Sequence, residues 1–140
     1  VIDTSSMVWI GITESCFMDQ VELIRRNGGT IFTSDDIHDM GASEVGKRAG
    51  ALAIKGCDYI YMSFDIDVID GGFSSGTGTP TMGATTPSSL MKILDELAKY
   101  PIGSMDLVEN APVLEPSGRT ARMAAEALVR LLSPKIFDIK

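Results

Sequence analysis

Residues 58–64 read Asp-Tyr-Ile-Tyr-Met-Ser-Phe and are apolar or aromatic at almost every position. A strand with water on one face alternates apolar and polar residues, whereas a strand covered on both faces is apolar nearly throughout. This segment therefore predicts a buried parallel strand in an α/β domain, with helices on both faces of its sheet.

The rest of the chain alternates short apolar runs with amphipathic stretches. Strands are predicted at residues 7–13, 30–33 and 102–108, and helices at residues 16–26, 43–55, 86–97 and 117–133. Ser43 and Ser117 are expected to cap two of these helices, and residues 34–41 are expected to form a polar turn or a single helical turn. Strands alternating with helices indicate βαβ units on one parallel sheet, where ligands bind at the carboxyl ends of strands.

The charge balance limits the partners of the chain. Its 140 residues, enough for one domain of ordinary size, contain 12 Lys and Arg against 19 Asp and Glu, a net charge of −7. This balance argues against a nucleic acid or an anionic membrane as partner and allows a cationic ligand. No apolar run reaches the roughly 18–20 residues that cross a bilayer.

The two cysteines and the amino terminus bear on the compartment. Cys16 and Cys57 belong to no CxxC or Cys/His motif, so both are expected to be reduced and at least partly buried. The start of the chain has no basic segment followed by an apolar one, as a signal peptide would have. A cytoplasmic protein is the expectation, and a removed leader stays open as an alternative.

Asp65 and Asp67 follow the 58–64 strand at positions i and i+2. If the strand geometry continues, both carboxylates point to the same face, roughly 6–7 Å apart. Two like charges at that spacing are unfavourable unless a cation holds them, and carboxylate oxygens suit Mg²⁺, Mn²⁺ or Ca²⁺. The alternative is a solvated turn in which Asp only forms the turn. The buried strand before these residues and the glycine-rich loop of residues 71–86 after them favour the metal site.

Two other motifs begin similarly. An EF-hand loop fails here, because its twelfth position would be Gly76 and not Glu. The strand ending in Asp65-Ile-Asp67 also matches the start of a haloacid-dehalogenase-type phosphatase. No convincing set of the other residues such an enzyme needs follows it, so this interpretation stays as an alternative.

A longer pattern surrounds the two aspartates. Ser63-Phe-Asp-Ile-Asp-Val-Ile-Asp70, then Phe73, Gly76-Thr-Gly-Thr-Pro80 and Gly83, resembles the third signature of the ureohydrolase (arginase/agmatinase) family. The likeness extends to other segments of the chain. They are Val8-Trp-Ile-Gly-Ile12, residues 32–41, Met105-Asp-Leu-Val-Glu109-Asn-Ala-Pro112 and Thr120-Ala121 with the alanine-rich residues after it.

The resemblance implies a three-layer α/β/α fold and a site with two Mn²⁺ ions, where activated water attacks the guanidinium carbon and urea is released. By this likeness Asp65 bridges both metals, Asp67 binds one, and Glu109 pairs with the guanidinium of a small cationic substrate. Asp65 and Glu109 are thus the implied catalytic residues, and Glu109 and Thr79 the implied substrate-binding ones. Asp70 and Asp106 are expected to fix the loop and the strand, not to bind metal. His38, the single histidine, is expected at the surface.

The chain departs from the family pattern in several places. Gly71 stands where the signature has Pro, and Thr13 stands where the early strand is followed by Arg. The signatures Gly-Gly-Asp-His and Asp-Ala-His-x-Asp, which supply the other metal ligands in the family, have no counterpart in this sequence. Residues 1–140 are therefore expected to be the C-terminal portion of a single ureohydrolase domain.

Several expectations about the whole protein follow from the likeness. An agmatine-like substrate is preferred over an arginine-like one, and a homo-oligomer, trimer or hexamer, is expected. The isolated chain is expected to be inactive. A non-catalytic fragment is the alternative from another class of function.

Overall fold

The computed structural model describes residues 4–13 and 18–136. Four strands form two parallel pairs: β1 (Val8–Ile12) with β2 (Thr30–Thr33), and β3 (Ile60–Asp65) with β4 (Ile102–Val108). Between and after them lie the helices α1 (Met18–Arg26), α2 (Ser34–Met40), α3 (Ala42–Ala53), α4 (Pro87–Leu97) and α5 (Arg119–Ile136). Two short 3₁₀ helices, η1 (Thr4–Ser6) and η2 (Ile66–Val68), complete the elements.

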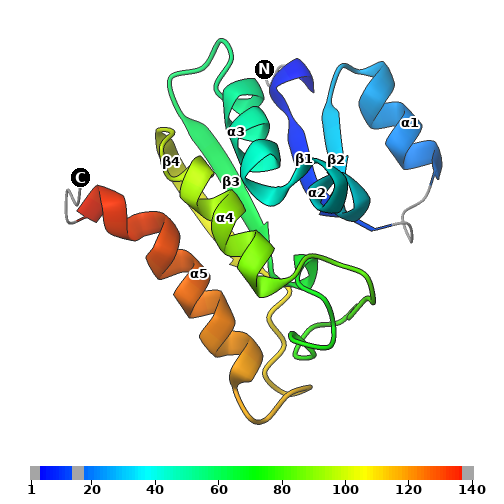
Figure 1. Cartoon of the computed structure of the whole chain (residues 1–140), viewed down its shortest axis with the longest axis vertical. Helices are drawn as coiled ribbons and strands as arrows, with labels where there is room; N and C mark the ends of the chain where they lie inside the picture. Colours follow the sequence, from blue (N-terminus) through cyan, green and yellow to red (C-terminus); the bar gives the residue numbers. More distant parts are fainter. Residues whose placement is uncertain (1–3, 14–17, 137–140) are drawn as a thin grey trace.

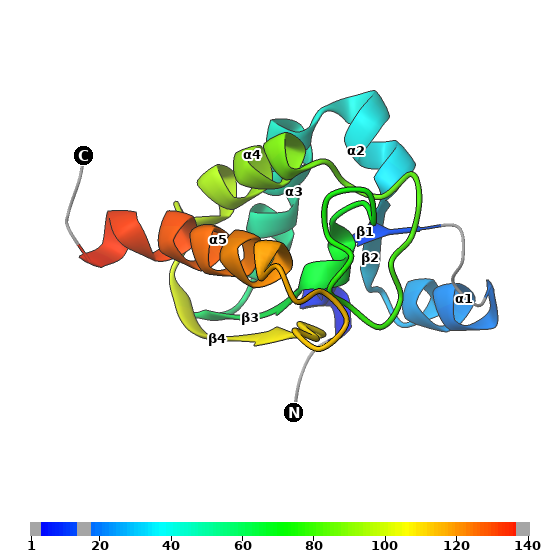
Figure 2. The ribbon, with the colours of Figure 1, turned by 90° about the horizontal axis from the view of Figure 1, so that it is seen from below.

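The helices and strands are arranged as an α/β fold (Figure 1). Helices α3, α4 and α5 lie together on one side of β3 and β4 (Figure 2). Their apolar side chains form one core with the strands, including Val45 of α3, Phe64 of β3, Leu94 of α4 and Leu131 of α5, each at most 4% exposed. The core therefore holds β3 and β4 rigidly from the helix side, and their carboxyl ends carry the predicted site.

Helix α4 begins as the sequence predicts. Thr86 is its N-cap and accepts a hydrogen bond from the Ser89 backbone N–H at 3.1 Å, and Pro87 occupies the first helical position. Both features suit a helix start, because proline has no N–H to leave unsatisfied there. The helix carries Asp95 on its exposed side, where Arg130 of α5 binds it through Nε and Nη2 at 2.5 and 2.8 Å.

Residues 34–40 form a helix of seven residues, longer than the polar turn or single helical turn that the sequence predicts. Thr33 caps α2: its hydroxyl accepts from the Asp36 N–H at 3.1 Å, and the Asp36 side chain accepts from the Thr33 N–H at 2.8 Å. This reciprocal pair is a capping box, which stabilises a first helical turn. Because α2 ends at Met40 and Gly41 follows it, α3 begins at Ala42, and Ser43 lies inside the helix instead of capping it.

Helix α5 also differs from the expectation at both ends. Ser117 does accept the Arg119 N–H, but at 3.4 Å, whereas Glu115 accepts the Thr120 N–H at 2.9 Å and is the better first-turn partner. The helix continues past Pro134 to Ile136. A proline near the end of a helix removes one backbone hydrogen bond without breaking many turns, so the last turn can still form.

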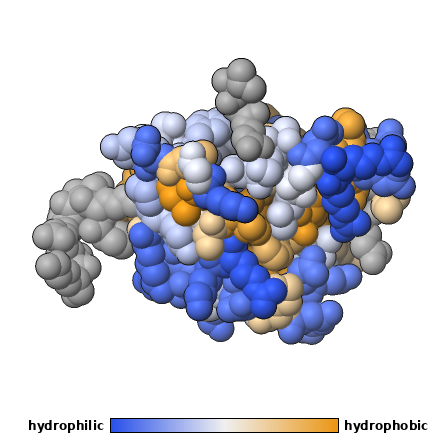
Figure 3. Space-filling model, turned by 90° about the horizontal axis from the view of Figure 1, so that it is seen from above, coloured by the Kyte–Doolittle hydropathy of each residue, from blue (hydrophilic) through white to orange (hydrophobic). Residues whose placement is uncertain are grey.

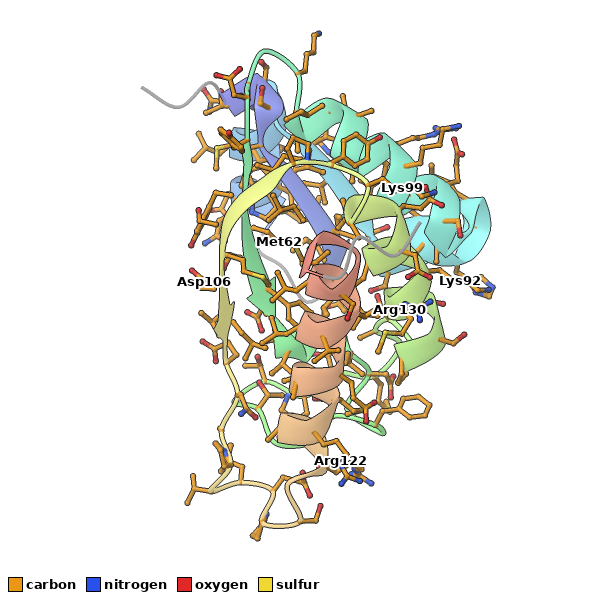
Figure 4. All side chains as sticks on the ribbon, turned by 90° about the vertical axis from the view of Figure 1, so that its left-hand side faces the viewer. Met62, Lys92, Lys99, Asp106, Arg122 and Arg130 are labelled. Carbon is orange, nitrogen blue, oxygen red and sulfur yellow. The ribbon has the colours of Figure 1, made fainter. Side chains whose placement is uncertain are left out.

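Strand β3 is covered on one face, not on both as its composition suggests. Tyr61 is 63% exposed, whereas Phe64 is 4% exposed. Figure 4 shows Met62 on the helix side of the sheet and Asp106 of β4 on the opposite side. On that open side, Asp106 accepts hydrogen bonds from the hydroxyls of Tyr61 and Ser63, the latter at 2.7 Å. In the part of the chain that the structure describes, no helix packs on this face.

The face seen in Figure 3 mixes hydrophilic residues with separate apolar patches. Among the described helices, none combines the length and apolarity that a membrane crossing requires.

Candidate active site

The site starts at the carboxyl end of β3. The backbone stays extended at Asp65 and then turns into η2, so Asp67 does not continue the strand as the i, i+2 argument assumed. The turn is stabilised by Asp65 itself, whose Oδ1 accepts the Asp67 backbone N–H at 3.0 Å. The two aspartates are therefore brought together by an aspartate-capped turn and not by strand alternation.

The environment of Asp65 disfavours its charged form. Its pKa is raised to about 6, first because burial removes water from the carboxylate, and then because Asp67 and Glu109 are also acidic. The hydrogen bond from the Asp67 N–H acts in the opposite direction but is outweighed. A carboxylate that is held among other carboxylates in a partly dry place is a good partner for a cation.

Glu109 enters the site from the neighbouring strand. Asp65 lies opposite Val108 in the parallel β3–β4 register, and Glu109 is the next residue after Val108. Its φ is +62°, a left-handed conformation that non-glycine residues adopt rarely. Its carboxylate reaches the glycine-rich loop, where a Cβ built on Gly78 would lie 3.7 Å from Glu109 Oε2. Such local strain is typical of functional positions.

Asp70 holds the two ends of the glycine-rich loop together. Its Oδ1 accepts the Gly72 N–H and its Oδ2 accepts the Gly83 N–H, each at 2.8 Å. Its backbone N–H donates to the Thr85 carbonyl at 3.0 Å. The contacts agree with the expectation that Asp70 fixes the loop, and the contacts of Asp106 with two side chains of β3 agree with the same expectation for β4.

The middle of the loop is anchored to α5. The Gly76 N–H donates to Thr120 Oγ1 at 2.9 Å, and the Gly76 carbonyl accepts from the Ala111 N–H at 2.7 Å. A Cβ on Gly76 would lie 2.9 Å from side-chain atoms of both Glu115 and Thr120, so glycine is required by the close approach. Thr120 is 1% exposed and Glu115 is 9% exposed.

The support that Glu115 and Thr120 give to the loop does not emerge from the sequence. There, Thr120 stands out only as part of a likeness in the last helix. The signal that could have indicated this support is the pair of polar residues, Glu115 and Thr120, next to the start of an alanine-rich helix.

Thr79 lies at the exposed tip of the loop. Its hydroxyl donates to Asp67 Oδ2 at 2.7 Å. The residue expected near the substrate is therefore in direct contact with an expected metal ligand.

The remaining predicted residues lie apart from this group. His38 is exposed on α2, as expected. Cys57 is exposed and not partly buried, because it follows the end of α3 in a surface turn, and Cys16 lies outside the described residues.

The donors at the site fit a hard divalent cation only in part. Asp65 and Asp67 offer carboxylate oxygens, the ligand type that Mn²⁺ and Mg²⁺ prefer. Over residues 4–13 and 18–136, however, no three His, Cys, Asp or Glu side chains come close enough together to hold a metal ion by themselves. These two aspartates could thus contribute part of a coordination shell.

Comparison with known proteins identifies the family of the chain. The sequence profile of the Arginase family matches residues 1–133. Agmatinases from Enterobacter sp. (strain 638) and Escherichia coli O7:K1 are each 34% identical over 131 residues, covering 94% of this chain and 40% of theirs. The chain belongs to the arginase family.

Solved structures give the same result for the fold. Arginase from Bacillus caldovelox superposes with a TM-score of 0.88 at 27% identity, covering 97% of this chain and 46% of that one. Formimidoylglutamase from Bacillus subtilis superposes with a TM-score of 0.89 at 24% identity, covering 96% and 42%. The expected α/β fold of arginase type is confirmed, and the chain spans about two fifths of the length of the agmatinases it matches.

Proposed function

We propose that the protein to which these residues belong hydrolyses a guanidino compound with Mn²⁺ and releases urea. The observation that carries the proposal is the group of three acidic side chains where β3 and β4 end. Asp65 and Asp67 follow β3, Glu109 follows β4, and the pKa of Asp65 is raised by burial and by its acidic neighbours. A site of this kind is suited to bind positive charge, both as metal ion and as substrate.

The roles of the residues follow from their chemistry. Asp65 and Asp67 would hold Mn²⁺, with Asp65 shared between two ions. When bound, the metal supplies Lewis-acid activation of water near neutral pH. Glu109 would pair with the guanidinium, whose N–H groups suit a carboxylate acceptor. Membership of the arginase family supports the proposed chemistry. The roles of the individual residues rest on the resemblance of residues 63–83 and 105–112 to motifs of that family.

Thr79 adds a constraint on the substrate. Because its hydroxyl proton is donated to Asp67, its oxygen can only accept a further hydrogen bond. A guanidinium has N–H donors and no acceptor, so it matches such an oxygen. The Thr79 oxygen would therefore bind the substrate by accepting a hydrogen bond from one of these N–H groups.

Agmatine is the preferred substrate, since the 34% identical relatives are agmatinases, and arginine is the alternative. We further propose that residues 1–140 form the C-terminal portion of one ureohydrolase domain, whose other portion supplies the remaining ligands. Alone, the chain would bind Mn²⁺ weakly and have no useful activity. A trimer or hexamer and a cytoplasmic location stay predictions.

The test is urea release by a protein that contains this chain within a complete arginase-type domain. With Mn²⁺ and agmatine or arginine, we expect urea from the parent protein and a loss of at least about a hundredfold in Asp67→Ala. Ser88→Ala, at an exposed position of α4, is the matched control and should keep full activity. Full activity in Asp67→Ala would overturn the metal assignment. Hydrolysis of p-nitrophenyl phosphate with Mg²⁺, without urea release, would favour the phosphatase alternative.

A further inference from the structure

We propose that Thr79 is a positioning residue that fixes the orientation of the Asp67 carboxylate. The two residues are twelve positions apart, yet Thr79 Oγ1 lies 2.7 Å from Asp67 Oδ2. The consequence for metal binding rests on the proposed function, in which Asp67 is a ligand. The positioning itself rests only on the geometry of the loop.

A hydroxyl can orient a carboxylate only if the hydroxyl is itself held in place. Asp70 provides the first restraint, because its two oxygens accept the N–H groups of Gly72 and Gly83. One side chain thus joins the start and the end of the segment that carries Thr79. Asp70 follows η2 closely, so the loop is tied to the same turn that carries Asp67.

Contacts beside Thr79 provide the second restraint. The Gly71 N–H donates to the Thr81 carbonyl at 2.9 Å, and the Thr81 hydroxyl donates to the Thr79 carbonyl at 3.1 Å. A Cβ on Gly71 would lie 2.9 Å from Pro80 Cβ, so the backbone at Gly71 packs directly on Pro80. The tip of the loop is therefore folded back on its own beginning, with little room to move away from Asp67.

The chemistry of the pair determines what the contact does. A carboxylate that accepts a hydrogen bond from a fixed hydroxyl on one oxygen is held in one side-chain rotamer, so the direction of its other oxygen is also set. Groups that orient metal ligands in this way commonly change metal affinity by about ten- to a hundredfold when they are removed. Threonine at position 79 would thus act on the metal through Asp67, without touching it.

The experiment compares Thr79→Val, which has the same shape without the hydroxyl, with Thr79→Ser, which keeps the hydroxyl. The Asp67 side-chain rotamer is measured in the metal-free 140-residue chain from three-bond NMR couplings. We expect the Asp67 side chain to occupy one rotamer in the unmodified chain and in Thr79→Ser. In Thr79→Val we expect couplings averaged over several rotamers. Unchanged couplings in Thr79→Val would overturn the proposal.

Binding of Mn²⁺ alone is then measured from the loss of the free-ion EPR signal. We expect about tenfold weaker binding in Thr79→Val and binding within about twofold of the parent in Thr79→Ser. Equal affinity in all three chains would overturn the part of the proposal that concerns the metal. If the unmodified chain binds no Mn²⁺ and the couplings respond as expected, the weak Mn²⁺ binding proposed for the isolated chain is wrong while the positioning of Asp67 stands.

Discussion

Gly11 of β1 lies directly against Val68 of η2, so close that a Cβ on Gly11 would overlap Val68 Cγ2. Gly11 also has a φ of +82°, where only glycine is unstrained. The same Cβ would lie 3.3 Å from Thr85 Oγ1. The first strand pair is therefore in contact with the turn that carries Asp67, and this contact depends on the absence of a side chain.

Replacing Gly11 with alanine should destabilise the fold strongly. Overpacking and the left-handed backbone together should lower the free energy of unfolding by about 2–4 kcal/mol, as measured by urea denaturation. Gly56→Ala is the matched control, because Gly56 has a φ of +75° but no atom within 4 Å of the position that the alanine methyl group would occupy. It should cost only about 1 kcal/mol. Equal losses in the two variants would contradict the close contact.

Thr33 and Ser43 offer a direct test of which residue caps a helix. Thr33→Ala removes the acceptor for the Asp36 N–H and should cost about 1 kcal/mol in free energy of unfolding. Ser43→Ala should change it by less than about 0.5 kcal/mol, because Ser43 is exposed inside α3. Thermal or urea unfolding of both variants decides the matter, and a larger loss from Ser43→Ala would restore the cap expected from the sequence.

Several elements show where prediction from sequence succeeds. Predictions are correct where a short run of residues determines one element by itself. Strands β2 and β4 have the expected bounds, and Thr86-Pro87 starts α4. Thr33 ends β2 and caps α2 at once, so assigning it to the strand hides its second role.

Features set by distant parts of the chain are harder to predict. The exposure of Tyr61 depends on what covers the sheet, which the composition of β3 does not reveal. At the candidate site, the resemblance to family motifs points to Asp65, Asp67 and Glu109. The turn of η2 between the aspartates and the left-handed backbone of Glu109 come only from the structure. Spacing in sequence indicates which residues meet, whereas the path of the backbone decides how they meet.

The ion pair of Asp95 and Arg130 should couple α4 to α5. A double-mutant cycle with Asp95→Asn and Arg130→Gln should give a small favourable coupling at low salt, and a smaller one in about 1 M NaCl. The bidentate geometry should make it larger than the coupling of Glu22 with Arg26, a single contact of 2.9 Å within α1.

This coupling should also depend on pH. Arg130 lowers the pKa of Asp95 in the folded chain. The stabilisation is therefore present above the ordinary aspartate pKa of about 4 and is lost as the pH falls through the lower, folded value. A coupling that grew on acidification would contradict the assignment.

Asp65 should show the opposite dependence. Its pKa is raised to about 6 in the folded chain, so the fold binds its proton more tightly than the unfolded chain does. That contribution is fully present below the ordinary pKa of about 4 and is lost as the pH rises through about 6. In the metal-free chain, Asp65→Asn should therefore raise the free energy of unfolding at about pH 8, by roughly 1 kcal/mol once solvent screening is allowed for, and leave it unchanged near about pH 4.

Unfolding curves at the two pH values provide the measurement, with Asp39→Asn, at an exposed position of α2, as the control that should have no such effect. If Asp65→Asn were destabilising at the higher pH, the carboxylate would be stabilising in its charged form and the cost of burying it would be refuted. Added Mn²⁺ should reverse the order of the two chains, because a cation stabilises the charged Asp65 and gains nothing from a neutral amide in its place. Asp65 would then lower the free energy of unfolding of the metal-free chain and raise that of the metal-bound chain. This is expected when a carboxylate is retained for binding and not for stability.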